Sequence, residues 1–226
     1  MFGKNKKMNS VRKNIILLVF MILLCIGCSP YQAKLDEAFA NYSGEYCILV
    51  DKTKYILNVY NRSRKLIVSY PAGYGINPDG KTKLHSGDNR TPEGLYYINE
   101  ILSMDAATDS PAYRKLKHMN EVYFSARGGH YKYGSTKEDL GDNAYGPRFF
   151  GIDYPNEHDK KRYEDSVNAG LIKPEGVGGG IAIHGNNDPD GVGHKSSSGC
   201  VRLYNKDVLE LERFILIGTP VVIVSK

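Results

Sequence analysis

The chain has 226 residues, enough for one domain of roughly 150 to 200 residues and a tail. Its composition, 41% hydrophobic and 24% charged with 24 Gly and 10 Pro, excludes collagen, coiled coil and wholesale disorder. The net charge of +5 comes from basic residues near the N-terminus. Without residues 1–27, the 25 remaining basic residues balance 25 acidic ones. Charge therefore gives no support for a nucleic-acid partner.

The N-terminal segment has the pattern of an export signal. A basic stretch precedes an apolar run from Ile15 to Ile26, which is too short to span a bilayer and fits the apolar region of a signal peptide. The next residues, Cys25-Ile26-Gly27-Cys28, resemble a bacterial lipobox, although Cys25 stands where leucine is usual. The resemblance implies a lipoprotein-type signal peptide at 1–27, with Cys28 lipidated. We therefore expect an exported, membrane-anchored lipoprotein that faces the periplasm or cell wall. The alternatives are an ordinary cleaved leader and an uncleaved anchor, in which Cys28 carries no lipid.

Patterns typical of β-strands dominate the chain that follows a short tether at 28–44. The predicted strands are two runs around a polar turn within 45–60, and further runs at 65–70, 95–98, 122–124, 181–183 and 221–224. The predicted helices lie at 112–119, at 159–169, and from a cap at Asn205 to a stop at Gly218. Much of 103–180 is expected to be loop. The sequence thus predicts a mainly β domain at 45–226 with a few short helices and a long inserted loop region.

Two cysteines remain as thiols once Cys25 leaves with the leader and Cys28 is lipidated. Export to an oxidising compartment makes a disulfide between Cys47 and Cys200 one possibility, although Cys47 lies in an apolar run and is better interpreted as a small buried side chain. Cys200 lies in a loop of small polar residues, Ser196-Ser197-Ser198-Gly199-Cys200, where backbone amides can approach a ligand closely. A cysteine needs a nearby base to become a nucleophile, and His184, at the end of a predicted strand, is the candidate. The amides of Ser198, Gly199 and Cys200 are candidate oxyanion donors.

Several segments in the right order resemble the L,D-transpeptidase catalytic (YkuD-type) family of bacterial cell-wall enzymes. The resemblance covers most of residues 45–226. The segments that carry it are Ile183-His184-Gly185, Ser197-Ser198-Gly199-Cys200-Val201-Arg202-Leu203-Tyr204-Asn205, Gly87-Asp88-Asn89-Arg90-Thr91-Pro92-Glu93-Gly94-Leu95-Tyr96-Tyr97-Ile98, Gly151-Ile152-Asp153-Tyr154-Pro155-Asn156 and Gly218-Thr219-Pro220-Val221. One position departs from the pattern, since many members have a second histidine where Ser198 stands.

The resemblance implies a β-sandwich fold and the roles of individual residues. Cys200 would be the nucleophile, His184 the general base, and the backbone around Ser198 and Gly199 the oxyanion site. The residues expected to contact substrate are Arg202, Gly185 and Asn205. Arg202 is alternatively a strut for its loop, and Asn205 alternatively only caps a helix.

The implied substrate is the stem peptide of peptidoglycan, attacked at its third residue to give a thioester. An amine acceptor would give a 3–3 cross-link or attach an amine to the wall, with a bearing on wall biogenesis and cell shape. Water would make the protein an L,D-carboxypeptidase or hydrolase. A third alternative is a lipoprotein that binds the wall without catalysis.

A metal site is the remaining alternative, because the chain has six histidines. It has no HExxH motif, paired CxxC or close histidine pair, so we expect no metal and no cofactor. His194, shortly before Cys200, is kept as a second candidate base. The histidines expected to be solvated are His85, His118, His130, His158 and His194.

Overall fold

The computed structural model describes residues 30–122 and 129–225, so the predicted signal peptide and Cys28 lie outside the described residues. The chain divides into two units, residues 1–36 and 37–226. Helix α2, Gln32–Ala40, crosses this boundary and falls within the predicted tether. None of the helices in the described ranges is long and apolar enough to cross a membrane.

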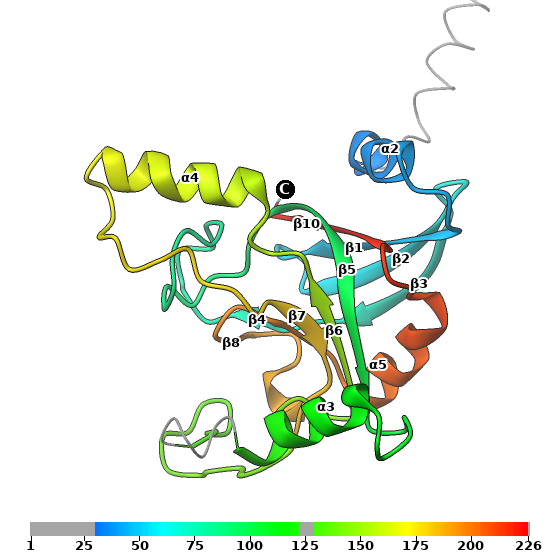
Figure 1. Cartoon of the computed structure of the whole chain (residues 1–226), viewed down its shortest axis with the longest axis vertical. Coiled ribbons are helices and arrows are strands. Elements are labelled where there is room, and N and C mark those ends of the chain that lie inside the picture. Colours follow the sequence, from blue (N-terminus) through cyan, green and yellow to red (C-terminus); the bar gives the residue numbers. More distant parts are fainter. Residues whose placement is uncertain (1–29, 123–128, 226) are drawn as a thin grey trace, which may run out of the picture. The chain divides into compact units, whose positions relative to one another are not determined.

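The second unit is built on one curled sheet (Figure 1). The sheet has eight strands in the order β3-β2-β1-β10-β5-β6-β7-β9, and β4 and β8 form a separate pair. The strands of the large sheet are β1 Tyr46–Asp51, β2 Ile56–Asn61, β3 Leu66–Pro71, β5 Gly94–Ser103, β6 Arg148–Ile152, β7 Ala182–His184, β9 Val201–Arg202 and β10 Pro220–Val224. The small pair consists of β4 Tyr74–Gly75 and β8 Lys195–Ser197. The helices that follow α2 are α3 Pro111–Val122, α4 Glu157–Asn168 and α5 Asn205–Leu211, with 3₁₀ turns at Pro189–Gly191 and Glu212–Phe214.

Strand β5 joins the two halves of the sheet. Its first residues, Gly94–Tyr97, pair with β10, whereas Ile98–Ser103 pair with β6, and the register shifts between Ile98 and Glu100. Such an irregularity bends a strand, so the sheet can curl around one core. That core includes Ile48 and Leu57 from one half and Phe150 and Ile183 from the other. The predicted mainly β fold with few helices is confirmed.

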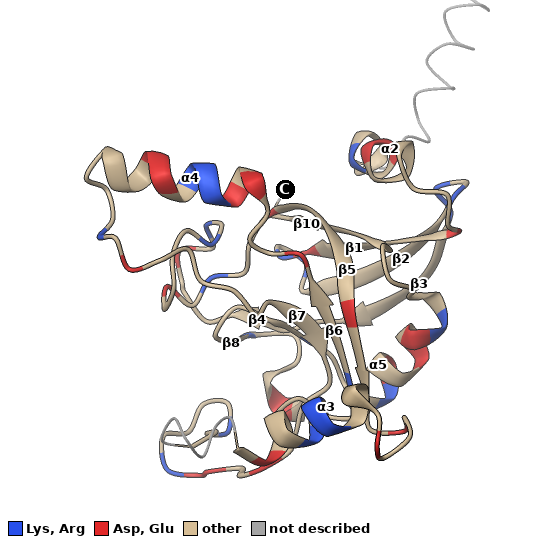
Figure 2. Ribbon diagram, viewed as in Figure 1, with Lys and Arg blue, Asp and Glu red and all other residues tan. Residues whose placement is uncertain are grey.

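The region 103–180 contains more regular structure than the sequence predicts. The helices expected at 112–119 and 159–169 are confirmed as α3 and α4, and α4 begins with a capping box between Asn156 and Asp159. The strand expected at 122–124 is wrong at Val122, which ends α3, and its other residues lie outside the described ranges. Strand β6 is missing from the predicted strands because Arg148 and Gly151 interrupt its five-residue run, whereas β10, which is equally buried, has an unbroken apolar run. Figure 2 shows most of the charged residues on helices and loops rather than on the strands.

Candidate active site

The parallel pairing of β7 with β9 determines which side chains share a face. Ile183 lies beside Val201 and His184 beside Arg202. Because side chains alternate along a strand, Ile183 and Val201 enter the main core, and the residues flanking them face the other way. On that second face Cys200 packs against a smaller apolar cluster that contains Ala182 and Phe149. The predicted nucleophile, the predicted base and Arg202 are therefore presented on one side of the sheet.

A cavity of about 550 Å³ opens on this side. It is lined by Lys83, Ser86, Gly87, Asn89, Gly129, Tyr145, Gly178, Gly179, Gly180, Ile181, His184, Ser197, Ser198, Cys200 and Arg202. Four residues predicted for the site, Cys200, His184, Ser198 and Arg202, thus meet in one cavity. Gly199, Gly185 and Asn205 do not line it.

His184 forms part of the wall of the cavity and is only 2% exposed. Its ring lies 4.9 Å from that of Tyr145 and stacks with Phe149 at 6.0 Å. Nδ1 is hydrogen-bonded to the carbonyl oxygen of Gly185. A carbonyl only accepts, so the neutral ring carries its proton on Nδ1 and leaves the lone pair of Nε2 as the acceptor. Burial lowers the pKa of His184 to about 3, and the charge of Arg202 acts in the same direction.

Cys200 is half-buried and carries a free thiol. Its Sγ lies 3.5 Å from the carbonyl oxygen of Gly180. Burial raises the pKa of the thiol, while a hydrogen bond from the backbone of Ala182 and the charges of Arg202 and Lys83 oppose that rise. The resting pair is accordingly a neutral thiol and a neutral imidazole. The proton would leave the sulfur during attack, when the base can take it.

Cys47 is also a free thiol, buried in β1, so the structure contains no Cys47–Cys200 disulfide. Burial raises the pKa of Cys47 to about 12, with the charge of Arg64 opposing that rise. A thiol of this kind is a packing residue rather than a nucleophile.

Short hydrogen bonds hold the loop that precedes Cys200. Ser197 Oγ donates to the carbonyl of Cys200 at 2.6 Å and accepts from the amide of Gly199 at 3.1 Å. Thr91 Oγ1, buried and 108 positions upstream of Gly199, donates to the carbonyl of Gly199 at 2.7 Å. Of the three predicted oxyanion donors, the amide of Gly199 is therefore already engaged. The amides of Ser198 and Cys200 are left to serve that role.

Arg202 is 5% exposed, and its Nη1 donates to the carbonyl of Ser196 at 2.8 Å. Burial lowers the pKa of its guanidinium, and the negative charge that Cys200 and Asp188 can carry opposes this. One of its nitrogens therefore supports the loop, which is the alternative role considered for Arg202. The side chain nevertheless lines the cavity.

Asn205 and Gly185 lie behind the site and shape it indirectly. Asn205 Oδ1 accepts from the amide of Asn186 at 2.9 Å, which fixes the chain just after His184. A side chain at Gly185 would collide with this oxygen, so the close approach requires glycine. The predicted cap is wrong, because α5 begins at Asn205 and its N-cap residue is Tyr204, which makes no side-chain cap bond.

Of the other histidines, His194 and His130 differ in their exposure. His194, the second candidate base, is exposed, stacks on Tyr133 at 4.7 Å and does not line the cavity. His130 is buried rather than solvated, which corrects the prediction for this residue. Burial lowers its pKa, and Arg202 contributes in the same direction. Within residues 30–122 and 129–225, no group of His, Cys, Asp and Glu side chains could hold a metal ion.

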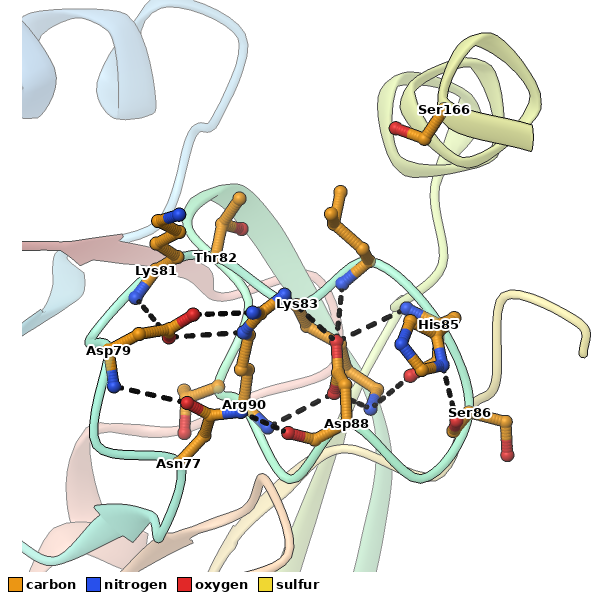
Figure 3. A network of polar contacts seen from close by, with 12 residues as sticks. Asn77, Asp79, Lys81, Thr82, Lys83, His85, Ser86, Asp88, Arg90 and Ser166 are labelled. Carbon is orange, nitrogen blue, oxygen red and sulfur yellow. Dashed lines mark hydrogen bonds and ion pairs between the residues drawn. The ribbon is translucent and has the colours of Figure 1, made fainter. Parts of the chain in front are cut away.

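A lysine that the sequence analysis did not single out also lines the cavity. Lys83 lies in the segment 76–91, whose polar network is shown in Figure 3. Asp88 accepts from Lys83 Nζ at 2.8 Å and from three backbone amides, those of Leu84, His85 and Arg90, at 2.7 to 3.2 Å. A single lysine in a polar loop carries no sequence pattern that predicts burial.

A free thiol, a neutral imidazole with an available nitrogen and loop amides with no acceptor among the described residues, all at one cavity, are the kinds of group that acyl transfer by a cysteine requires. The sequence profile of the L,D-transpeptidase catalytic domain (YkuD) family matches residues 45–223. The chain belongs to this family.

Three relatives give the extent of the likeness. YkuD of Bacillus subtilis (strain 168), which its name assigns to the L,D-transpeptidases, is 49% identical over 41 residues, which are 18% of this chain and 25% of that one. The K307A mutant of Pgp2, a helical cell shape determining protein from Campylobacter jejuni, is 22% identical, with a TM-score of 0.50 over 85% of this chain and 53% of that one. Bd1075 from Bdellovibrio bacteriovorus is 27% identical, with a TM-score of 0.47 over 80% of this chain and 48% of that one. The chain spans about half the length of the two solved proteins, and the likeness to Pgp2 concerns the fold.

Proposed function

We propose that the protein is a peptidoglycan L,D-transpeptidase that works through a thioester on Cys200. The observation that carries the proposal is the presence of the free Cys200 thiol, neutral His184 and the amide-bearing loop at one cavity. Family membership supports the class of reaction. The buried rings around His184 keep water from the imidazole, which favours its neutral, proton-accepting form.

These positions support the following chemistry. His184 Nε2 takes the proton of the thiol as Sγ attacks the carbonyl carbon of the third stem residue, and a C–S bond forms. The amides of Ser198 and Cys200 stabilise the resulting oxyanion. The intermediate collapses by breaking the C–N bond, and His184 returns the proton to the departing D-Ala amine. The nitrogen of an acceptor amine then attacks the thioester carbonyl. A new C–N bond forms, the C–S bond breaks, and the proton that the amine loses restores the thiol.

Gly185 and Asn205 are assigned supporting roles in this proposal. They set the position of the chain that follows His184, whereas Arg202 lines the donor cavity. The proposed partner is the peptidoglycan stem peptide, and the proposed consequence of the reaction is a change in wall cross-linking that bears on cell shape. No cofactor is required by any step.

The proposal extends to the location of the protein. A lipid on Cys28, after removal of residues 1–27, would hold the catalytic domain at a membrane facing the periplasm or cell wall, with residues 28–44 as the tether.

The test is mass spectrometry of the products formed from disaccharide tetrapeptides. We expect the wild type and Cys47→Ala, which removes the other free thiol, to form product, and Cys200→Ala to form none. Cross-linked dimers identify an amine acceptor, whereas tripeptide and free D-Ala alone identify a hydrolase. Wall binding without any acyl-enzyme or product would instead identify a non-catalytic lipoprotein.

A further inference from the structure

The cavity beside Cys200 has an uneven charge. Among the described residues that line it, the lysine and arginine side chains are Lys83 and Arg202, and no aspartate or glutamate takes part. His184 is neutral there, because burial holds its pKa at about 3. A partly enclosed cavity with cationic walls favours an anionic ligand, since the surrounding protein screens charge less than water does.

The two cations differ in what they can offer a ligand. Arg202 commits one nitrogen to Ser196 and supports the loop that carries the nucleophile. Lys83 belongs to a different segment and is 5% exposed. Its Nζ donates to Asp88 Oδ1 at 2.8 Å and to the carbonyl of His85 at 3.0 Å. An ammonium group has three N–H donors, so one donor remains for a ligand in the cavity.

Lys83 is held firmly in place by its segment. The carboxylate of Asp88 accepts hydrogen bonds from Lys83 and from three backbone amides. The amides hold the carboxylate in place, and the carboxylate in turn holds the ammonium group. A second ion pair, between Arg90 and Asp79, ties the segment together from the other side (Figure 3). Such pre-organisation lowers the entropy lost on binding.

Lys83 also shares its cavity with the nucleophile. Both residues line the same cavity of about 550 Å³. In a stem tetrapeptide, the bond attacked by Cys200 is followed by a single residue that ends in a carboxylate. A cation in the wall of the cavity that Cys200 lines is therefore placed to receive that group.

We propose that Lys83 is a specificity-determining residue that binds the C-terminal carboxylate of the donor peptide, so that the enzyme selects stems with one residue after the scissile bond. The inference rests on the proposed function and deepens it. The ammonium group donates its remaining N–H to the carboxylate, a charge-assisted hydrogen bond. Longer stems would place an amide, not a charge, at this point.

The test compares two donors, a tetrapeptide with a free C-terminus and the same peptide with a C-terminal amide, using the full-length chain. A stem can also carry a carboxylate on the side chain of its third residue. A third donor, amidated only on that side chain, shows which of the two carboxylates the enzyme recognises. The variants are Lys83→Met, Lys83→Arg and Lys81→Met, the last removing an exposed lysine of the same segment. Lys83→Met/Asp88→Asn avoids leaving a buried carboxylate without its cation.

We expect the wild type to prefer the free acid over the C-terminal amide, and Lys83→Met to lower kcat/KM for the acid by about tenfold to 100-fold while changing that for the amide less than about threefold. The double variant should behave like Lys83→Met. Lys83→Arg should recover part of the preference for the free acid, and Lys81→Met should match the wild type. An equal loss for both donors would overturn the inference, and so would a preference that only side-chain amidation removes.

The affinity of Cys200→Ala for the same peptides, with and without Lys83→Met, measures the selectivity in the absence of turnover. If the wild type forms no product but binding still prefers the free acid in a Lys83-dependent way, the proposed function fails and the carboxylate site stands. If turnover occurs without that preference, the site fails and the proposed function stands.

Discussion

The buried imidazole of His184 should make the protein lose stability in mild acid. Its pKa is about 3 in the folded protein against 6.5 ordinarily. Below pH 6.5 the unfolded chain therefore takes up a proton that the folded protein excludes. The contribution of His184 to stability is complete above pH 6.5 and is lost progressively as the pH falls toward 3. At pH 5, one and a half units below the ordinary value, the loss is about 2 kcal/mol, because each unit corresponds to about 1.4 kcal/mol.

The assay is urea unfolding of the wild type and His184→Gln at pH 7.5 and pH 5, followed by circular dichroism. Glutamine removes the titrating group, and its lost ring contacts cost the same at both pH values. The free-energy difference between the two proteins should therefore change by about 2 kcal/mol between the two pH values, in favour of the variant at pH 5. His158→Gln, which replaces an exposed histidine, is the matched control and should track the wild type. A difference between wild type and His184→Gln that does not vary with pH would refute the reasoning.

Three further predictions concern Cys200, Gly199 and Asn205. Because the pKa of Cys200 is raised, its alkylation by iodoacetamide should accelerate about tenfold per pH unit from pH 6 to 8, and a plateau below pH 7 would contradict a neutral resting pair. Gly199→Ala should lower the free energy of unfolding by about 2 to 4 kcal/mol, since φ is +139° and the new methyl would lie 2.9 Å from a carbonyl oxygen. Gly193→Ala, in open space, should cost about 1 kcal/mol, and equal losses would argue against the contact. Asn205→Ala should cost about 1 to 2 kcal/mol in urea unfolding through the loss of its bond to Asn186, and an unchanged midpoint would show that this bond contributes nothing.

Local pattern was enough to predict the parts of the fold that depend on it. The apolar runs of β1, β2 and β10 and the polar, periodic helices α3 and α4 all carry signals within their own sequence. Strand β6 does not, since Arg148 and Gly151 interrupt its short apolar run and its pairing with β5 and β7 defines it only in the completed sheet.

The site was predictable only where residue types carry chemistry. Cys200 and His184 stood out by their settings, and their assigned roles stay predictions until turnover is measured. Lys83 and His130 lie outside the helices and strands and are nevertheless buried, and nothing near them in the sequence signals this burial. Asn205 was expected to cap a helix, but the chain turns one residue earlier, and its side chain instead supports the segment after the base.

The hydroxyl of Thr91 connects the Thr-Pro-Glu-Gly segment to two parts of the chain that are distant in sequence. It accepts from the amide of Gly75 at 2.9 Å and donates to the loop of the nucleophile, while its own chain continues back to Arg90 and the segment that carries Lys83. The loop that carries Cys200 is thus joined, through one oxygen atom, to the chain that leads back to Lys83. A natural variant altered at this threonine would be expected to shift Cys200 and the segment of Lys83 together, although position 91 does not line the cavity.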